Sequence, residues 1–175
     1  MNSIAIRKAT EEDLPQILDI YNHVIVNTTA VYSYKPHTLE MRKAWFEERK
    51  ENNFPVFVAT IDGKIVGFSS YGKFRVWPAY KYTVENSVYV HESYRGRGIA
   101  KQLLQVLIDD AKEKDYHAMI AGIDSSNEVS MKLHGQFGFV EVANFKQVGF
   151  KFGKWLDLKF MELVFETPAN PTEEG

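Results

Sequence analysis

A short turn rich in arginine and glycine joins a strand pattern to a helical pattern, and it constrains the fold more than any other stretch. The strand-like run 82–90 ends in VYV, and apolar residues at helical spacing begin at Ile99. Between them, RGRGIA occupies residues 95–100. Glycines let a main chain approach an anion closely, and a helix N-terminus exposes N–H groups and positive potential. The residues alone fit either a phosphate-binding turn or a tight connection with solvated arginines.

Two better-known phosphate motifs are absent from the chain. There is no G-x-x-x-x-G-K-S/T, which excludes the ATPase phosphate loop, and no G-x-G-x-x-G followed by an acidic residue, which excludes the dinucleotide fingerprint. The turn therefore needs another explanation.

Periodicity and turn signals predict elements in the order β-α-α-β-β-β-α-β-α-β-β, which indicates one mixed α/β (α+β) domain over residues 1–166. Strands are expected at 4–7, 82–90, 117–124, 139–143 and 155–165, and in a hairpin at 55–72 whose Asp62-Gly63 pair suits a type I′ turn. Helices are expected at 14–25, after a capping-box-like start at Thr10 and Asp13, at 39–50, at 99–114 and within 125–139, where Gly138 ends the last one. Residues 167–175 form a polar tail without a core-forming pattern.

Composition removes several classes of partner. A formal net charge of −2 gives no basic excess for nucleic acid, and the absence of cysteine excludes disulfides and thiolate chemistry. The five histidines are scattered without ligand spacing, so no metal is expected. No apolar run approaches the roughly 20 residues that span a membrane, and the N-terminus lacks a secretory signal pattern. We expect a cytoplasmic protein that associates with no membrane.

The turn also carries a family resemblance. RGRGIA matches the Q/R-x-x-G-x-G/A signature of the GNAT superfamily of N-acetyltransferases, in the same place between a strand and a helix. Within the superfamily, YTVENSVYV, SMKLHGQFGF and GFKFGKWLDLKFMELVF resemble phosphinothricin and methionine sulfoximine acetyltransferases. The resemblance implies a GNAT fold with a mixed central sheet flanked by helices, and a homodimer. It also implies transfer of the acetyl group of acetyl-CoA to the α-amino group of a small amino-acid-like acceptor.

The resemblance also implies a cofactor site. Main-chain N–H groups of the turn would hold the pyrophosphate of acetyl-CoA, and the preceding strand would pair with the pantetheine arm. Asn127 would bind the pantetheine amides, although from the residues alone it reads as a helix N-cap. The implied cofactor-binding residues are Val88, Tyr89, Val90, Arg95, Gly96, Arg97, Gly98, Ile99, Ala100, Asn127 and Ser130.

Two residues are candidates for proton transfer. An α-amino group with a pKa of about 8 must lose a proton before it attacks, and a carboxylate within reach can take that proton. Glu85 stands in the middle of a strand, where glutamate is disfavoured, but a solvent-facing glutamate would need no function. The resemblance makes Glu85 the base. It places His134 where many members carry tyrosine, and leaves open whether His134 serves the amine or the departing thiolate.

The acceptor site is expected near a loop rich in aromatic residues. Arg75 can clamp a carboxylate through paired hydrogen bonds, or it is a surface arginine stacked on a ring. The expected substrate-binding residues are Phe74, Arg75, Val76, Glu85, Asn86 and Ser87. The stretch WPAYKY departs from the herbicide-resistance enzymes, because Lys81 stands where they carry aspartate. A polyamine, an aminoglycoside or a protein N-terminus therefore remains an alternative acceptor, and a non-catalytic acyl-CoA-binding module remains an alternative function.

Overall fold

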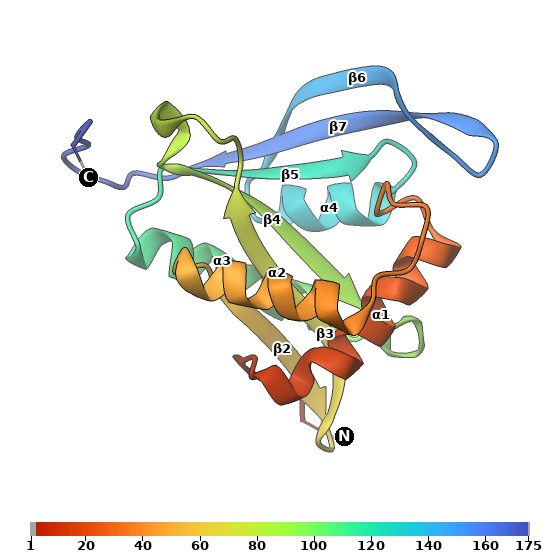
Figure 1. The fold of residues 1–175 in the computed structure, drawn as a ribbon. Coiled ribbons are helices and arrows are strands. Elements are labelled where there is room, and N and C mark those ends of the chain that lie inside the picture. The colour runs from red at the N-terminus through yellow and green to blue at the C-terminus, as the bar shows by residue number, and fades with distance from the viewer. Residues whose placement is uncertain (1–2, 175) are drawn as a thin grey trace.

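A single mixed sheet organises the computed structural model, which describes residues 3–174 (Figure 1). Its seven strands lie in the order β1-β2-β3-β4-β5-β7-β6, and β4 and β5 form the parallel pair between antiparallel neighbours. The strands are β1 (Ala5–Lys8), β2 (Val56–Ile61), β3 (Lys64–Lys73), β4 (Thr83–Val90), β5 (Ala118–Asp124), β6 (Val140–Lys151) and β7 (Lys154–Val164). The helices are α1 (Leu14–Asn27), α2 (Leu39–Glu51), α3 (Ile99–Glu113) and α4 (Glu128–Gln136). The predicted order of elements and the mixed α/β class are confirmed.

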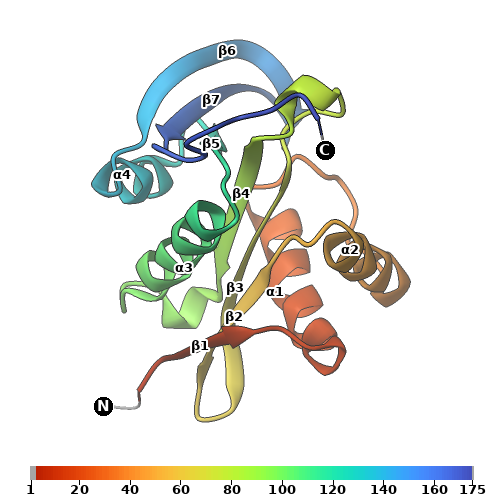
Figure 2. The same cartoon turned by 90° about the vertical axis from the view of Figure 1, so that its left-hand side faces the viewer.

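The helices cover the two faces of the sheet in pairs. Seen edge-on in Figure 2, α1 and α2 lie on one side of the central strands, and α3 and α4 lie on the other. Apolar side chains of α1 and α2 pack with β2 and β3, and those of α3 pack with β3, β4 and β5. Burial of each large apolar side chain contributes about 1.5–3 kcal/mol, so these two layers supply most of the stabilisation.

Local signals place α1 and the first hairpin. Thr10 and Asp13 form the expected capping box, which opens a short 3₁₀ turn that leads directly into α1. Asp62 and Gly63 both have positive φ, at 50° and 76°, as the type I′ turn between β2 and β3 requires. Both predictions are confirmed because their signals are contained within four residues.

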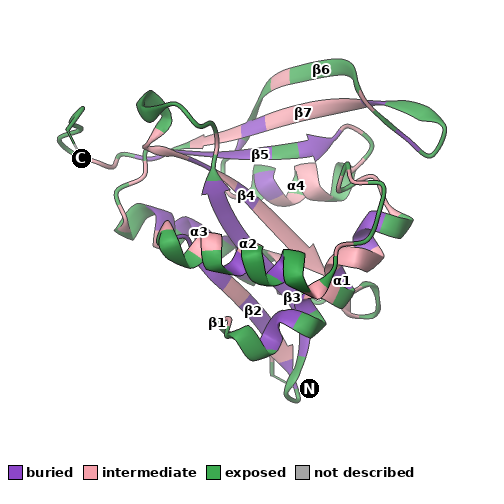
Figure 3. Cartoon of the chain, in the orientation of Figure 1, coloured by how far each residue is buried: buried purple, intermediate pink, exposed green. Residues whose placement is uncertain are grey.

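The C-terminal hairpin differs from the prediction. A strand was expected at 139–143, but β6 continues to Lys151 and turns at Phe152 and Gly153 into β7. Figure 3 shows β6 largely exposed, and its pairing with β7 is shifted between Phe145 and Gly149. An exposed outer strand with a bulge has no regular alternation of apolar and polar residues, so its length leaves little trace in the sequence.

Lys151 ties this hairpin to the segment that follows α1. Its side chain is 4% exposed, and Nζ donates hydrogen bonds to the carbonyl oxygens of Ile25 at 2.6 Å, Thr28 at 2.8 Å and Val31 at 2.7 Å. Burial lowers the pKa of Lys151. One ammonium group thus satisfies three main-chain carbonyls at the end of a helix, where a cation also complements the dipole.

No helix in residues 3–174 is both long enough and apolar enough to cross a bilayer. Residues 167–174 of the tail form no helix or strand, and they fold back onto the end of the sheet. There the Tyr82 hydroxyl donates to the Thr172 carbonyl at 3.1 Å, and Thr167 Oγ1 donates to the Tyr116 carbonyl at 2.6 Å.

Replacing Lys151 by methionine should lower the free energy of unfolding by about 2–4 kcal/mol, because carbonyl groups are left without a donor. Urea denaturation at pH 7.5 measures the change. Lys154→Met is the matched control, since Lys154 lies in the same hairpin with an exposed side chain, and it should change stability by less than about 0.5 kcal/mol. Equal losses of stability in the two variants would contradict the stabilising role of the three hydrogen bonds that Lys151 donates.

Candidate functional site

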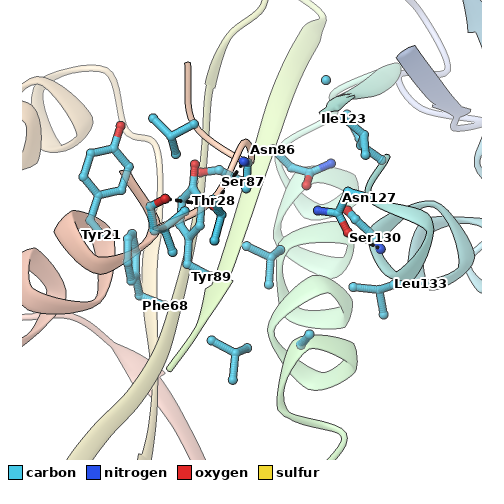
Figure 4. Close-up of a pocket in the computed structure, with 18 of the residues that line it drawn as sticks. Tyr21, Thr28, Phe68, Asn86, Ser87, Tyr89, Ile123, Asn127, Ser130 and Leu133 are labelled. Atoms are coloured by element: carbon cyan, nitrogen blue, oxygen red, sulfur yellow. Dashed lines mark hydrogen bonds between the residues drawn. The ribbon is translucent and has the colours of Figure 1, made fainter. Parts of the chain in front are cut away.

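The functional cleft begins where β4 and β5 stop pairing. The two parallel strands are paired only at residues 83–85 and 118–120. Beyond Glu85 they diverge, and the opening between them is part of a cleft of about 1280 Å³. In Figure 4, Tyr21, Phe68 and Tyr89 lie on one side of the β4 ribbon, while Asn127, Ser130 and Leu133 lie on the other.

The turn before α3 forms one end of the cleft. Gly96 and Gly98 have φ of 75° and 77°, a left-handed conformation that favours glycine. In the described part of the chain, the backbone N–H groups of residues 96–101 find no acceptor. Unpaired N–H groups at the positive end of a 15-residue helix bind anions such as phosphate. Of the two arginines, Arg95 lines the cleft and Arg97 does not. The Arg97 guanidinium lies over the Tyr94 ring, 5.2 Å from its centroid.

The point beyond Glu85 where β4 and β5 separate is called the fork. Beyond the fork, the edge of β4 that faces β5 is open. Residues 86–90 pair with β3 on one side and have no strand partner on the other within the described chain. Such an edge accepts an extended ligand as an added strand. Across the opening, Asn127 caps α4 by accepting a hydrogen bond from the Ser130 N–H at 3.1 Å, and both residues line the cleft.

Glu85 lies at the last paired position, on the floor of the cleft. Its Oε1 lies against Gly122 of β5, so closely that a Cβ at residue 122 would sit 2.9 Å from it. Burial raises the pKa of Glu85, and the charge of Arg75 opposes that shift. Gly122 was missed in the sequence, where a lone glycine in a buried strand was the available signal of a close approach.

Asn86 and His134 occupy the fork itself. The Asn86 amide donates to the Ile120 carbonyl at 3.2 Å, which turns Oδ1 toward His134 Nε2 at 3.1 Å. Nδ1 of the same ring lies 2.8 Å from the Ser130 carbonyl. Both ring nitrogens therefore face oxygen acceptors, and a neutral ring can donate to only one of them. Burial lowers the pKa of His134, and the Ser130 carbonyl acts in the opposite direction.

The expected substrate residues divide into two groups. Glu85, Asn86 and Ser87 line the cleft, whereas Phe74, Arg75 and Val76 do not. The Arg75 guanidinium lies 4.2 Å from the centroid of the Phe74 ring and donates a hydrogen bond to the Phe74 carbonyl at 2.8 Å. Arg75 therefore affects the site through its positive charge, which lowers the pKa of Glu85 against the effect of burial.

One wall of the cleft was missed entirely. It comes from α1, α2, the loop between them and β3, and it includes Tyr21, His37, Arg42, Trp45 and Phe68. An arginine in a polar helix is usually solvated, and only contacts between distant elements show otherwise.

Comparison with known proteins gives a consistent result. The sequence profile of the acetyltransferase (GNAT) family matches residues 17–139. The chain is 41% identical over 168 residues to the L-methionine sulfoximine/L-methionine sulfone acetyltransferase of Salmonella typhimurium, covering 96% of this chain and 98% of the relative.

Two solved structures superimpose closely. An N-acetyltransferase from Staphylococcus aureus Mu50 is 54% identical, with a TM-score of 0.91, covering 93% of this chain and 98% of that one. A GNAT superfamily phosphinothricin acetyltransferase from Sinorhizobium meliloti, in complex with acetyl-CoA, is 33% identical with a TM-score of 0.93, covering 98% and 94%.

Glu85→Gln should stabilise the protein at neutral pH. The pKa of Glu85 is raised in the fold from an ordinary value of 4.5, so the fold favours the neutral carboxyl group. The stability that this group contributes is fully present below pH 4.5 and is lost as the pH rises through the raised pKa. The melting temperature of Glu85→Gln should exceed that of the wild type at pH 7.5, and the difference should disappear near about pH 4. Glu113→Gln, on the exposed surface of α3, is the control. A lower melting temperature for Glu85→Gln at pH 7.5 would show that the carboxylate is not held at a cost.

Proposed function

The chain belongs to the acetyltransferase (GNAT) family, and on that premise we propose that it transfers the acetyl group of acetyl-CoA to the α-amino group of a small amino-acid-like acceptor. The acceptor is of the methionine sulfoximine, methionine sulfone or phosphinothricin type. One observation carries the proposal: the Glu85 carboxylate lies where the open edge of β4 meets a wall that bears cationic and aromatic side chains.

The residues present fit acetyl-CoA. The N–H groups of residues 96–101 would hold its pyrophosphate, with Arg95 adding positive charge. Residues 88–90 would pair with the pantetheine arm, and Asn127 would bind its amides from the other side. When bound, acetyl-CoA supplies a thioester whose acyl carbon is open to attack by an amine. Holding both reactants in one cleft accounts for much of the rate.

Glu85 acts as the general base. It takes the ammonium proton of the acceptor directly or through one water, and burial tunes its pKa toward the operating pH. N–H groups along residues 88–90 polarise the thioester carbonyl. His134 assists proton transfer near the fork and holds Asn86 in place.

The charge of the cleft favours an anionic acceptor over a polyamine. Its acidic lining residues are Glu85 and Asp124. Its basic ones are Arg42, Arg49 and Lys73 on the side of α2 and β3, and Arg95, Lys101 and Lys132 on the side where acetyl-CoA would bind. A polycation would be repelled by this lining, and an amino acid with an acidic or oxygen-bearing side chain would be attracted. The presence of both Glu85 and His134 argues against a non-catalytic acyl-CoA-binding module.

The direct test is initial-rate turnover of acetyl-CoA, read as free thiol. Turnover is expected on methionine sulfone, methionine sulfoximine and phosphinothricin, and not on spermidine. Glu85→Gln should lower kcat by about 10²- to 10⁴-fold while the KM for acetyl-CoA stays unchanged. Preference for spermidine would overturn the acceptor class, and a fully active Glu85→Gln would remove Glu85 as the base.

We also propose a cytoplasmic location and a homodimer assembled through the β6–β7 hairpin. The hairpin exposes several large apolar side chains on an outer edge of the sheet: Val140, Val142, Phe145, Val148, Phe150 and Trp155. An exposed apolar patch of this kind is a typical association surface.

Phe150→Glu should convert the dimer to a monomer, because a carboxylate would be buried in the interface. Light scattering coupled to gel filtration measures the mass. Val26→Glu, on the exposed face of α1, is the control and should leave the dimer intact. A wild-type monomer, or a dimer that survives Phe150→Glu, would reject this interface.

A further inference from the structure

A cationic pocket with aromatic walls lies on the side of the cleft formed by α1 and α2. At its centre Arg42 is 2% exposed, with its guanidinium 4.0 Å from the ring centroid of Tyr21 and 4.6 Å from that of Trp45. Phe68 and Tyr89 close the wall, and the Tyr21 and Tyr89 rings meet edge to face at 5.5 Å. We call this set, together with His37, the Arg42 pocket.

The Arg42 guanidinium lacks the partners that a buried charge requires. Within residues 3–174, Nε has no hydrogen-bond partner and no carboxylate pairs with the group. Its neighbours are neutral: Nη2 lies 3.5 Å from His37 Nδ1, and the Tyr21 hydroxyl interacts with the side chain. Burial lowers the pKa of Arg42, and the nearby hydroxyls of Tyr21 and Tyr89 offset only part of that effect. An unpaired buried charge is costly unless something else pairs with it.

A second arginine on α2, which is partly buried, has the partners that Arg42 lacks. Arg49 also lines the cleft, but its Nε donates to Ser70 Oγ at 3.1 Å and its Nη1 pairs with Glu48. Arg42 is therefore distinguished by a buried Nε without a partner and by the lack of an ionic partner, and its side chain lines the cleft.

The position of the pocket along β4 indicates which part of the acceptor reaches it. Glu85, Ser87 and Tyr89 alternate with inward residues and share one face of the strand, where alternate residues are about 6.6–6.8 Å apart. The α-amino and carboxylate groups of an amino acid share one carbon, so an amine held at Glu85 keeps its carboxylate nearby. Arg75 does not line the cleft, but its positive charge acts on Glu85 from outside it. The far end of the acceptor's side chain extends past Ser87 toward Tyr89 and Arg42.

We infer that Arg42 binds the oxygen atoms at the side-chain end of the acceptor, on its tetrahedral sulfur or phosphorus, and that the surrounding rings pack on the adjacent methyl and methylene groups. This inference rests on the proposed function. A guanidinium presents several N–H donors in a rigid plane, which suits sulfone, sulfoximine and phosphinate oxygens. Methionine fills the same space without those oxygens and leaves the charge unpaired.

The test compares methionine sulfone with methionine in the wild type, Arg42→Met and Arg42→Lys, with Lys43→Met as the matched control. Lys43 is the next residue of α2, half exposed and ion-paired with Glu11 at 3.7 Å. The kcat/KM of the wild type should be about 10- to 100-fold or more higher for methionine sulfone than for methionine. Bound methionine offers no oxygen to the buried Arg42 donors, and leaving them unpaired is unfavourable. Arg42→Met should lose most of this preference and act on methionine within about threefold of wild type, whereas Lys43→Met should leave turnover of both substrates unchanged. Arg42→Lys, which keeps the charge but not the planar set of donors, should give a preference between those of the wild type and Arg42→Met.

The outcomes separate the possibilities. An equal loss on both substrates would assign Arg42 to the carboxylate or to the fold and overturn the inference, and so would an unchanged preference. If the Arg42 variants fail to fold, calorimetric binding of the two ligands to the wild type in the presence of CoA decides: equal affinities overturn the inference. A wild type that acetylates no amino acid rejects the proposed function, and the inference falls with it.

Discussion

The early end of the pairing between β4 and β5 is the constraint on which the site depends. A parallel pair that continued along both strands would bury the hydrogen-bonding edge of β4 and leave no room for a ligand. Because pairing stops at Glu85 and Ile120, main-chain groups at the centre of the sheet stay available, protected from other chains by the helices on both sides. Open strand edges usually occur at the rim of a sheet, where they invite aggregation. Here the open edge is internal.

The amide of Asn86 makes this interruption stable. It occupies the position that the next ladder bond would take, donating to the Ile120 carbonyl while His134 meets its other end. The Asn86 side chain thus satisfies the Ile120 carbonyl, which would have no hydrogen-bond donor where the strand pairing ends. The same two residues that end the ladder also stand beside the reacting groups in the proposed mechanism, so that structure and chemistry share one set of hydrogen bonds.

Much of the fold was predictable because its signals are local. The capping box at Thr10, the turn at Asp62 and Gly63, and the glycine turn before α3 each lie within a few residues. Residues of the cofactor side of the cleft follow from that turn and from the resemblance. The acceptor wall was not predictable, since Arg42 in isolation reads as a solvated helical arginine, and only its position against Tyr21 and Trp45 shows otherwise. The length of β6 was unpredictable for a related reason: an exposed strand has no buried face to mark it.

The segment between α1 and α2 contributes Thr28 and Val31 to the mouth of the cleft, yet its main chain is held by the ammonium of Lys151. The Tyr34 hydroxyl adds a second tie by donating to the Phe150 carbonyl at 2.8 Å, and Tyr32 packs against Gly149. The shape of this loop is thereby fixed by two strands, β6 and β7, that do not line the cleft themselves. Substitutions in the hairpin would therefore change the shape of the loop, and with it the choice of acceptor, without changing any residue that lines the cleft.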